Sequence, residues 1–462
     1  MVPEVRDKVF WVLGAARSGC AAGALLRRHG ARVVGIDDRN EAALGRRWER
    51  EGLTDLAPRA FDDLLTGGRR PSPGKLPEAV VISPGVPPGH DLLTGLPETV
   101  EVMGELELAS RFCRAELVAI TGTNGKSTVT AWCAHVLGHG GRRVEAVGNL
   151  GRPLALVADE LAPGDAAVVE VSSFQLETMR TFSPRAAAVL NLAPDHLDRY
   201  GSLEAYYAAK RIMAGLVPVG GSLVVWTGCP EAVSWPTSAD RILYGSRELG
   251  ARIYEQEGDL VAEGGDGGIL PLVPVAELAL SSPPNRINAQ AVAALALAMG
   301  LAPEEIAPGL RDFPGLPHRH QLVGRLGGVD FVNDSKATNV HAVCAGLRGY
   351  ARPVILIAGG SGKGEDYSPL AEVMDAVRTV LVIGEEGPRI AAALDDVVPC
   401  AAGGTMEEAV TRGAQLAAEI GNATVLLSPA CASFDMFANY RDRGRAFAAA
   451  VAGLGAEMIS GP

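Results

Sequence analysis

The chain has 462 residues, which corresponds to about three domains of ordinary size. Apolar residues make up 47% and charged residues 21%, the proportions of a globular protein rather than a disordered one. The net charge of −12 argues against a nucleic-acid surface as the main function, because phosphate binding needs clustered Lys and Arg.

Targeting and redox features point to the cytoplasm. No stretch reaches the roughly 18 uninterrupted apolar residues of a membrane span, and no basic segment followed by an apolar run marks secretion. The seven cysteines form no CxxC pair, which fits reduced thiols rather than a disulfide framework or a zinc site. We therefore expect a cytoplasmic chain that has neither a nucleic-acid nor a membrane partner and that acts as a monomer.

The dominant pattern along the chain is a short apolar run, a turn containing Gly or Ser, and then a helical stretch. In chain order, this pattern predicts strands at residues 8–13, 31–36, 79–82, 116–121, 166–171, 186–192, 353–358, 379–383 and 423–427. Continuous apolar strands that alternate with helices are typical of α/β domains with parallel sheets covered on both faces. We place the three domains at residues 1–105, 106–315 and 316–462, with an irregular loop at 67–77 and a hairpin or loop at 258–268.

The first domain begins with a partial dinucleotide-binding pattern. The run LGAARSG at residues 13–19 follows a strand, and Asp37 and Asp38 end the next one, but Ala16 replaces the middle glycine of the usual fingerprint. Arg17 and Ser18 lie within this turn, and the run from Ser83 to Gly85 follows another strand. Together these features favour a site for a ligand with ribose and pyrophosphate groups.

The strongest motif is the run AITGTNGKST at residues 119–128, where a strand enters a glycine turn and a helix follows. Glycines let backbone N–H groups face phosphate oxygens, and a helix N-terminus favours the same negative charge. Lys126 would then bridge the outer phosphates of a nucleotide, and the Ser127 hydroxyl would reach Mg²⁺. The turn is a shortened variant, because Ile120 stands where the standard P-loop has its first glycine. A glycine turn without any ligand is the alternative.

Two further polar side chains follow predicted strands of the central domain. Glu170 ends one apolar strand, and His196 lies just beyond the next. Ligands of open parallel sheets bind at the carboxyl ends of the strands, so Lys126, Glu170 and His196 should meet at one edge. A carboxylate and an imidazole beside phosphates fit Mg²⁺ chemistry.

Lysine is rare in this chain: only six of the 42 basic residues are Lys. Lys210 shares a predicted apolar helix stripe with Leu203, Tyr206 and Met213, and Ser202 can cap that helix. One interpretation is a lysine whose amine reaches past an apolar face to solvent. The other is a desolvated amine with a lowered pKa that takes part in chemistry.

The third domain offers another set of polar residues after strands or in glycine-rich turns. They lie in the runs LPHRH (316–320), VNDSKATN (332–339), GGSGKG (359–364) and SPACASFD (428–435). Lys336 and Lys363 make two of these loops cationic, and small hydroxyl residues stand nearby. This combination favours an anionic second substrate, although the run at 359–364 could also be a plain turn.

These motifs, taken together, resemble the Mur ligase family of peptidoglycan synthesis over essentially the whole chain. Residues 121–128 match its TGTNGKST run, residues 170–175 its E-x-S-S-F-Q segment, and Asn191, Asp195 and His196 its N-x-x-x-D-H pattern. Asn285 and Asn288 match an N-x-x-N pair, although Pro284 replaces the usual preceding His. The runs at 333–339 and 428–433 are similar to those of the D-glutamate-adding subgroup.

The resemblance implies an ATP-dependent amide ligase that adds D-glutamate to UDP-N-acetylmuramoyl-L-alanine through an acyl phosphate. It also implies a Rossmann-like N-terminal domain, a central P-loop ATPase-like domain with a mostly parallel sheet, and a Rossmann-like C-terminal domain. Two Mg²⁺ ions would be held by Ser127, Glu170, His196 and Lys210, the last as a carbamate.

The resemblance assigns the remaining roles residue by residue. Catalysis would involve Lys126, Glu170, His196 and Lys210. ATP would be bound by Gly122, Thr123, Asn124, Gly125, Lys126, Ser127, Thr128, Asn288, Arg319 and Asp334. The UDP-sugar substrate would be bound by Arg17, Ser18, Asp37, Asp38, Ser83, Gly85 and Asn149, with Ser172 and Gln175 also on the substrate side. D-glutamate would be bound by Thr338, Lys363, Ser433 and Tyr440, and Lys336 would also bind substrate.

Three other protein classes share parts of these patterns. Folylpoly-γ-glutamate synthetase has the same core but lacks the run at 333–339. A P-loop switch or motor ATPase would hydrolyse nucleotide without an acceptor amine and leaves that run unexplained. A Rossmann oxidoreductase would need a glycine at Ala16.

Overall fold

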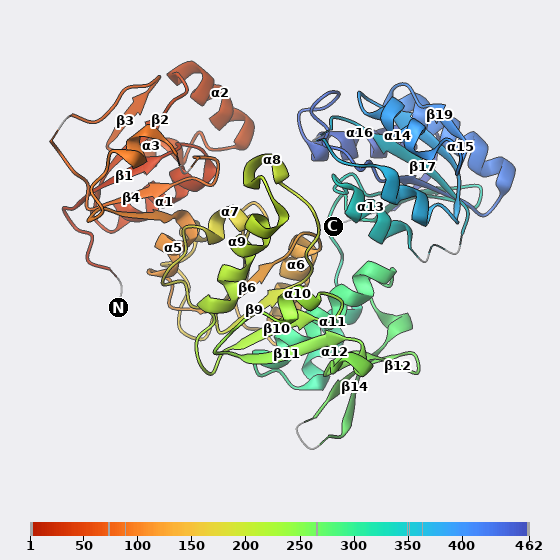
Figure 1. The fold of residues 1–462 in the computed structure, drawn as a ribbon, viewed down its shortest axis with the longest axis horizontal. Coiled ribbons are helices and arrows are strands. Elements are labelled where there is room, and N and C mark those ends of the chain that lie inside the picture. The colour runs from red at the N-terminus through yellow and green to blue at the C-terminus, as the bar shows by residue number, and fades with distance from the viewer. Residues whose placement is uncertain are drawn as a thin grey trace.

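The computed structural model describes residues 3–72, 74–87, 89–264, 267–348, 350, 352–362 and 364–459, without the side chain of Asp198. Three α/β units follow one another along the chain, coloured red to orange, orange through yellow to green, and teal to blue in Figure 1. Each unit has its own sheet and packed apolar residues. The chain therefore has the α/β class that its alternating pattern predicts.

The first unit is a five-stranded parallel sheet in the order β3-β2-β1-β4-β5. Its strands are β1 (Val9–Leu13), β2 (Arg32–Asp37), β3 (Asp63–Thr66), β4 (Ala79–Ile82) and β5 (Glu101–Gly104). Its helices are α1 (Arg17–Arg28), α2 (Glu41–Glu51), α3 (Ala57–Ala60), α4 (Asp91–Thr94) and α5 (Glu105–Ser110). Gly19 lets α1 start against the preceding turn, since a Cβ there would lie 1.9 Å from the Gly14 oxygen.

The second unit is a nine-stranded sheet in the order β14-β13-β12-β11-β10-β9-β6-β8-β7. Its neighbouring strands pair in parallel, except that β13 is antiparallel to both β12 and β14. Its strands are β6 (Glu116–Thr121), β7 (Val144–Gly148), β8 (Ala166–Glu170), β9 (Ala186–Val189), β10 (Ser222–Trp226), β11 (Asp240–Gly245), β12 (Ile253–Gln256), β13 (Asp259–Glu263) and β14 (Ile269–Pro274). Its helices are α6 (Lys126–Gly138), α7 (Ser173–Leu176), α8 (Leu197–Tyr200), α9 (Leu203–Leu216), α10 (Pro230–Val233), α11 (Pro283–Ala298) and α12 (Pro303–Arg311).

The third unit is a seven-stranded sheet in the order β19-β18-β17-β20-β16-β15-β21, with β15 antiparallel to both of its neighbours. Its strands are β15 (Gln321–Leu326), β16 (Val329–Asn333), β17 (Val354–Gly359), β18 (Val377–Ile383), β19 (Cys400–Ala402), β20 (Thr424–Leu427) and β21 (Glu457–Met458). Its helices are α13 (Val340–Leu347), α14 (Gly387–Leu394), α15 (Met406–Ile420) and α16 (Tyr440–Gly453).

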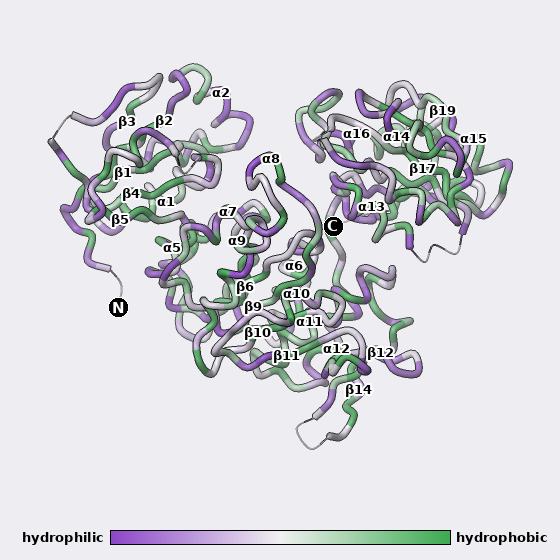
Figure 2. Tube along the Cα trace, viewed as in Figure 1, coloured by the Kyte–Doolittle hydropathy of each residue, from purple (hydrophilic) through white to green (hydrophobic). Residues whose placement is uncertain are grey.

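All nine strands expected from the apolar runs are present, with their ends shifted by a few residues. The largest shift is in β9, which ends at Val189 rather than at residue 192. Strands such as β4 and β17 are buried along their whole length, and Figure 2 shows hydrophobic residues along them. The described residues of 258–268 form part of the β13–β14 hairpin, and the described residues of 67–77 are irregular.

Two further findings concern the described part of the chain. All seven cysteines are free. No described helix combines the length and the apolar character needed to span a membrane. The first sheet ends at Gly104 and the third begins at Gln321, but the domain boundaries near 105 and 315 stay predictions.

Candidate active site

The glycine turn after β6 has the expected geometry. Gly125 has a φ of +83°, and α6 begins at the next residue, Lys126. The Lys126 amine donates to the carbonyl oxygens of Gly122 at 2.9 Å and Thr123 at 2.8 Å, so the side chain folds back over its own turn. Burial lowers the pKa of Lys126, against the opposing effect of the nearby Glu170 carboxylate. The turn thus holds a cation at a helix N-terminus, the arrangement that favours phosphate groups.

Asn191 fixes the other side of this turn. Its Oδ1 accepts a hydrogen bond from the Asn124 backbone N–H at 2.8 Å, and its Nδ2 donates to the Asn124 carbonyl at 3.1 Å. The backbone of the turn is therefore held to the segment that follows β9. A preformed turn of this kind loses little conformational freedom when a ligand binds.

Glu170 ends β8 with one carboxylate oxygen paired and the other unpaired. Asn149 Nδ2 donates to Oε1 at 2.9 Å, while the buried Oε2 has no hydrogen-bond partner within the described part of the chain. An unpaired carboxylate oxygen in a buried place is costly unless a cation or donor meets it. Its environment fits a divalent cation, which prefers oxygen ligands.

His196 lines the same cavity as Glu170. It adopts a left-handed backbone conformation, with a φ of +53°, and its backbone N–H donates to Asp195 Oδ1 at 2.9 Å. Its ring packs against Phe174, with the ring centroids 4.9 Å apart. Left-handed geometry at a residue other than glycine is strained and clusters at functional sites.

Lys210 is buried beneath the glycine turn, with 1% of its surface exposed. Its Nζ donates to the Gly122 oxygen at 2.8 Å and lies 4.8 Å from the centre of the Tyr206 ring. The interpretation of a lysine that reaches solvent is therefore wrong, because the helix stripe faces the sheet rather than the surface. Burial, and after it the charge of Lys126, holds the pKa of Lys210 well below its usual range. A neutral amine can act as a nucleophile, which an ammonium cannot.

The third unit meets the glycine turn directly. Arg319 Nη2 donates to the Ser127 hydroxyl at 2.5 Å, across 192 residues of sequence. Asn124 Nδ2 and His341 Nδ1 lie 2.8 Å apart, and Asn339 Nδ2 donates to Asn124 Oδ1 at 3.4 Å. The two units therefore share one site.

Between them lies a cavity of about 370 Å³. Of the residues singled out from the sequence, it is lined by Thr123, Asn124, Gly125, Lys126, Ser127, Asn149, Glu170, Ser172, His196, Arg319, Lys336, Thr338, Ser433 and Tyr440. The amine of Lys336 lies 4.6 Å from the centre of the Tyr440 ring. Cations thus come from both units, as two anionic ligands would need.

Several expected residues lie around the cavity rather than along it. Asn288 stands behind the turn, where a Cβ on Gly125 would come within 2.7 Å of its side-chain oxygen. Asp334 accepts hydrogen bonds from the His320 N–H and the Ser428 hydroxyl, each at 3.1 Å, and burial raises its pKa to about 7. Gly122 supplies the carbonyl that both lysines contact, and Thr128 is buried in the first turn of α6. Lys363 lies outside the described residues.

Ser172 and Gln175 bond to each other. They form a capping box at the start of α7, in which the Ser172 hydroxyl accepts from the Gln175 N–H at 3.3 Å. The Gln175 Oε1 in turn accepts from the Ser172 N–H at 3.0 Å. Their local role is therefore to fix the turn after Glu170, and their contact with substrate stays a prediction.

A second cavity, of about 570 Å³, opens in the first unit at the carboxyl ends of β1, β2 and β4. Of the residues expected to bind the UDP group, it is lined by Arg17, Ser18, Asp37, Asp38, Ser83 and Gly85. The remaining one, Asn149, lines the other cavity.

The two aspartates of this cavity are already paired. Asp37 accepts from the Ala15 N–H at 2.8 Å and from both sides of the Arg39 guanidinium. Burial opposes ionisation of Asp37, but the Arg39 hydrogen bonds hold its pKa below the ordinary value. Asp38 pairs with Arg70 at 3.0 Å and with His90 at 3.1 Å.

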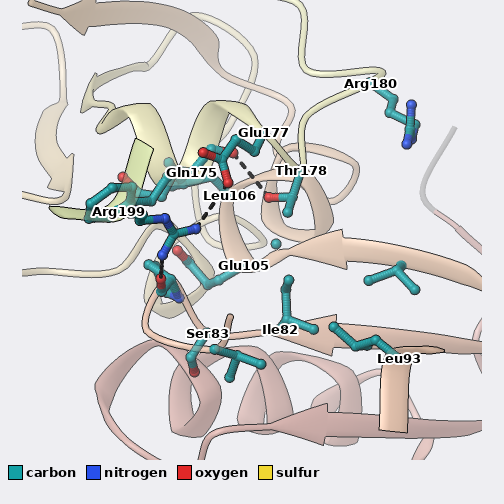
Figure 3. A pocket seen from close by; sticks show the side chains of 15 residues that line it. Ile82, Ser83, Leu93, Glu105, Leu106, Gln175, Glu177, Thr178, Arg180 and Arg199 are labelled. Atoms are coloured by element: carbon teal, nitrogen blue, oxygen red, sulfur yellow. Dashed lines mark hydrogen bonds and ion pairs between the residues drawn. The ribbon is translucent and has the colours of Figure 1, made fainter. Parts of the chain in front are cut away.

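A third, smaller cavity of about 290 Å³ lies where the first and second units meet (Figure 3). Arg199 donates to Glu177 Oε2 at 3.0 Å and to the Pro84 carbonyl at 3.3 Å, next to Ser83. Its guanidinium also lies 4.1 Å from the centre of the Phe174 ring, which in turn touches His196. The loop that follows β4 is thereby connected to the cavity between the second and third units.

Sequence reasoning missed Arg443, which holds the third unit's side of the cavity in place. Its guanidinium is 1% exposed and donates to the carbonyl oxygens of Ser335 at 2.9 Å, Cys431 at 3.0 Å and Ala432 at 3.0 Å. These residues flank Lys336 and Ser433. Only the burial of a charged residue in an otherwise ordinary helix marks Arg443, and the sequence does not reveal burial.

Known proteins match this chain in sequence and fold. A family model described as the Mur ligase middle domain matches residues 120–273, and one described as the Mur ligase, glutamate ligase domain matches residues 318–431. The UDP-N-acetylmuramoylalanine--D-glutamate ligase of Myxococcus xanthus is 42% identical, with 94% of this chain and 96% of the relative covered. The chain belongs to the Mur ligase family. A relative of the same name from Anaeromyxobacter dehalogenans is 40% identical, with 96% and 97% covered.

Solved structures show the same fold for this Mur ligase at low sequence identity. The UDP-N-acetylmuramate-alanine ligase MurC of Thermotoga maritima is 18% identical, with a TM-score of 0.60 over 97% of this chain and 99% of its own. The MurF ligase of Thermotoga maritima in complex with ADP is 14% identical, with a TM-score of 0.59 over the same shares. The expected architecture of a Mur ligase is confirmed.

Proposed function

We propose that this Mur ligase joins D-glutamate to the L-alanyl carboxylate of UDP-N-acetylmuramoyl-L-alanine, with ATP converted to ADP and phosphate. The observation that carries the proposal is the cavity shared by the second and third units, which brings a phosphate-binding turn next to a second cationic loop. Relatives named for this reaction match nearly the full chain at 36–42% identity, which supports the choice of substrates.

The chemistry needs activation of the carboxylate. A carboxylate is a poor electrophile, so the γ-phosphoryl group of ATP is first transferred to the L-alanyl carboxylate. The neutral amine of D-glutamate then attacks the acyl phosphate, and phosphate leaves from a tetrahedral intermediate. Lys126 and Arg319 stand where they offset negative charge on the transferring group, and positioning of this kind carries most of the catalysis in phosphoryl transfer.

Ser127, Glu170 and His196 would hold the two Mg²⁺ ions, and the unpaired oxygen of Glu170 fits a cation among the described residues. When bound, the ions offset the charge of the phosphate oxygens. Asn149 orients the Glu170 carboxylate through its hydrogen bond to Oε1. The cavity residues Thr123, Asn124 and Gly125 provide the backbone that faces the nucleotide.

Lys210 would act as a carbamate. A neutral amine adds CO₂ and releases one proton, which turns a neutral group into an anion with two oxygens able to meet a divalent ion. The deep burial and lowered pKa of Lys210 support this proposal, because both favour the neutral form of the amine. Arg could not be modified in this way, which gives a reason for a lysine in an Arg-rich chain.

The third unit would bind D-glutamate through Thr338, Lys363, Ser433 and Tyr440, and Lys336 would also bind substrate. The first unit would bind the UDP group in the cavity that Arg17 and Ser83 line. The substrate would run from there past Asn149 to the glycine turn. We place the reaction in the cytoplasm, with the chain acting as a monomer.

ADP release by the purified protein tests the proposal, with each substrate omitted in turn. Full turnover should require ATP, the UDP-sugar substrate and D-glutamate together, and L-glutamate should not replace D-glutamate. ADP release that is independent of the amino acid would favour a switch or motor ATPase instead. Turnover with a folate and L-glutamate would favour folylpoly-γ-glutamate synthetase.

A further inference from the structure

Two histidines and an aspartate form a cluster at the end of α6 opposite to Lys126. His135 Nε2 lies 2.6 Å from one carboxylate oxygen of Asp312, and His139 Nε2 lies 2.8 Å from the other. Within this group, one potential ligand atom of each residue lies within 4.8 Å of the others. The reaction proposed above uses none of the three residues.

Helix geometry brings the two imidazoles together. His135 and His139 are four residues apart on α6, so they lie on one face, one turn apart. Asp312 is the C-cap residue of α12, and its backbone N–H donates to the Pro308 carbonyl at 3.2 Å. Each ligand therefore comes from the end of a regular helix rather than from a long loop.

The two helices are packed closely at this point, which fixes the distance between the ligands. Gly309 allows the close approach, since a Cβ there would lie 2.8 Å from the Val136 Cα. The Trp132 indole N–H donates to the Gly309 carbonyl at 2.9 Å, and its ring stacks on Phe313 with the centroids 5.3 Å apart. Ligands on a rigid scaffold make a site that needs little rearrangement.

We propose that His135, His139 and Asp312 bind one divalent transition-metal ion of the zinc class. Two imidazole nitrogens and one carboxylate oxygen are ligands that zinc takes in proteins, whereas Mg²⁺ and Ca²⁺ prefer oxygen alone. The three side chains are 31%, 31% and 53% exposed, so an ion can enter from solvent, and water completes the four-coordinate shell. On binding, each imidazole keeps its proton on Nδ1 and offers the lone pair of Nε2 to the metal.

The ion would tie the last turn of α6 to the end of α12. Because it binds the folded arrangement of the two helices and not the unfolded chain, it raises the stability of the protein. It lies at the far end of α6 from the glycine turn, so turnover needs no metal here. The site is a structural clamp on the helix that carries the phosphate-binding residues.

Metal titration of the tag-free, full-length chain tests the site. Mg²⁺ is kept saturating to fill the active site, Zn²⁺ is titrated by calorimetry, and Co²⁺ serves as a spectroscopic probe. We expect one equivalent of Zn²⁺ and a Co²⁺ spectrum of a four-coordinate N/O site. His135→Gln and His139→Gln should each weaken Zn²⁺ binding at least about 10-fold. Changing a residue that only hydrogen-bonds to a metal ligand already costs about that much, and these variants remove a ligand itself.

A matched control separates chelation from a simple His–carboxylate contact. His29 lies 3.1 Å from Asp159 and is 30% exposed, but it has no second histidine four residues away. His29→Gln should leave Zn²⁺ affinity unchanged. Zn²⁺ should also raise the unfolding temperature of the wild type and not that of the double variant His135→Gln/His139→Gln.

Hydrogen exchange locates the bound ion. Zn²⁺ should slow amide exchange at residues 132–139 and 308–313, and not around Glu170 and His196. The proposal is overturned if the double variant binds Zn²⁺ as tightly as the wild type, or if protection appears only at the active site. It is also overturned if the wild type binds no Zn²⁺ under these conditions. The three residues would then only link the two helices through the hydrogen bonds between the histidines and Asp312.

Discussion

Glu105 and Glu107 are both buried in helix α5, yet their carboxyl groups meet different surroundings. Glu105 accepts a hydrogen bond from the Ala155 N–H at 2.7 Å, and burial raises its pKa to about 7. Burial also acts on Glu107, but hydrogen bonds from Thr181, the Arg180 N–H and Arg111 outweigh it and lower its pKa. The number of donors around each carboxylate therefore decides its charge.

The two glutamates should give opposite pH dependences. The raised pKa of Glu105 means that its contribution to stability is present below pH 4.5 and is lost as the pH rises to about 7. Glu105→Gln should therefore become more stable than the wild type over that range, by at most about 3 kcal/mol. Glu107→Gln should be less stable at neutral pH, and its deficit should shrink as the pH falls below 4.5. Thermal unfolding between about pH 2.5 and 8 measures both, and slopes of the same sign would show that burial alone governs the pair.

Lys126 carries the clearest catalytic prediction at the level of one residue. Lys126→Ala should slow ADP release on the order of 10²–10³-fold, because one preorganised donor to the transferring phosphoryl group is lost. Binding of the UDP-sugar substrate, measured by calorimetry, should be unchanged, since its cavity is in the first unit. Lys8→Ala is the control, because the Lys8 amine lies at the surface and pairs with Glu78, away from the glycine turn. Near-normal turnover of Lys126→Ala would remove the phosphate-binding assignment.

At the scale of elements, the end of strand β7, at Gly148 and the following Asn149, fixes the position of Glu170. Gly148 has a φ of +92°, and a Cβ there would come within 2.3 Å of the Glu170 carbonyl oxygen. The Asn149 N–H donates to that same oxygen at 2.9 Å. The two strands β7 and β8 therefore hold the candidate metal ligand through a contact that only glycine permits.

Gly148→Ala should lower kcat on the order of 10²-fold, as expected when a catalytic group is displaced by about 1 Å. Its unfolding free energy should fall by more than that of Gly141→Ala, where φ is +82° and nothing lies within 4 Å. The control carries only the cost of the left-handed backbone, about 1–2 kcal/mol. Equal stability and kinetics in the two variants would exclude the contact with Glu170 as the reason for the glycine.

The elements also show how far the sequence leads. Central strands such as β4 and β17 are buried on both faces, so their continuous apolar runs predict them directly. The edge strand β3 is partly exposed and carries Asp63 and Thr66, so its sequence lacks such a run. The site shows the same contrast. Lys126 and Glu170 lie at the carboxyl ends of central strands, so the apolar runs that predict these strands also predict which edge of the sheet the two residues share. The contacts of Arg443 and Arg199 depend on how distant segments pack, which no local pattern contains.

At the scale of the whole molecule, the cavity of the proposed reaction exists only where the second and third units meet. Arg319, from the third unit, reaches the Ser127 hydroxyl at the start of α6. We expect Arg319→Ala to reduce kcat/KM for ATP on the order of 10²-fold, because one charged donor leaves the phosphate site. Binding of the UDP-sugar substrate should persist. If the variant keeps wild-type kcat/KM for ATP, Arg319 serves only to hold the units together.

The bond between Arg319 and Ser127 also makes nucleotide binding and domain position thermodynamically linked. The hydroxyl that we expect to face Mg²⁺ is hydrogen-bonded to the Arg319 guanidinium, so Arg319 must leave Ser127 for the phosphate oxygens when Mg²⁺ and the nucleotide bind. By reciprocity, whatever holds the third unit in this position weakens the nucleotide by the same factor. A compound that binds between the two units and keeps Arg319 on Ser127 would therefore inhibit the enzyme without resembling a phosphate. Such a compound would be more selective than inhibitors that also bind other nucleotide-binding enzymes.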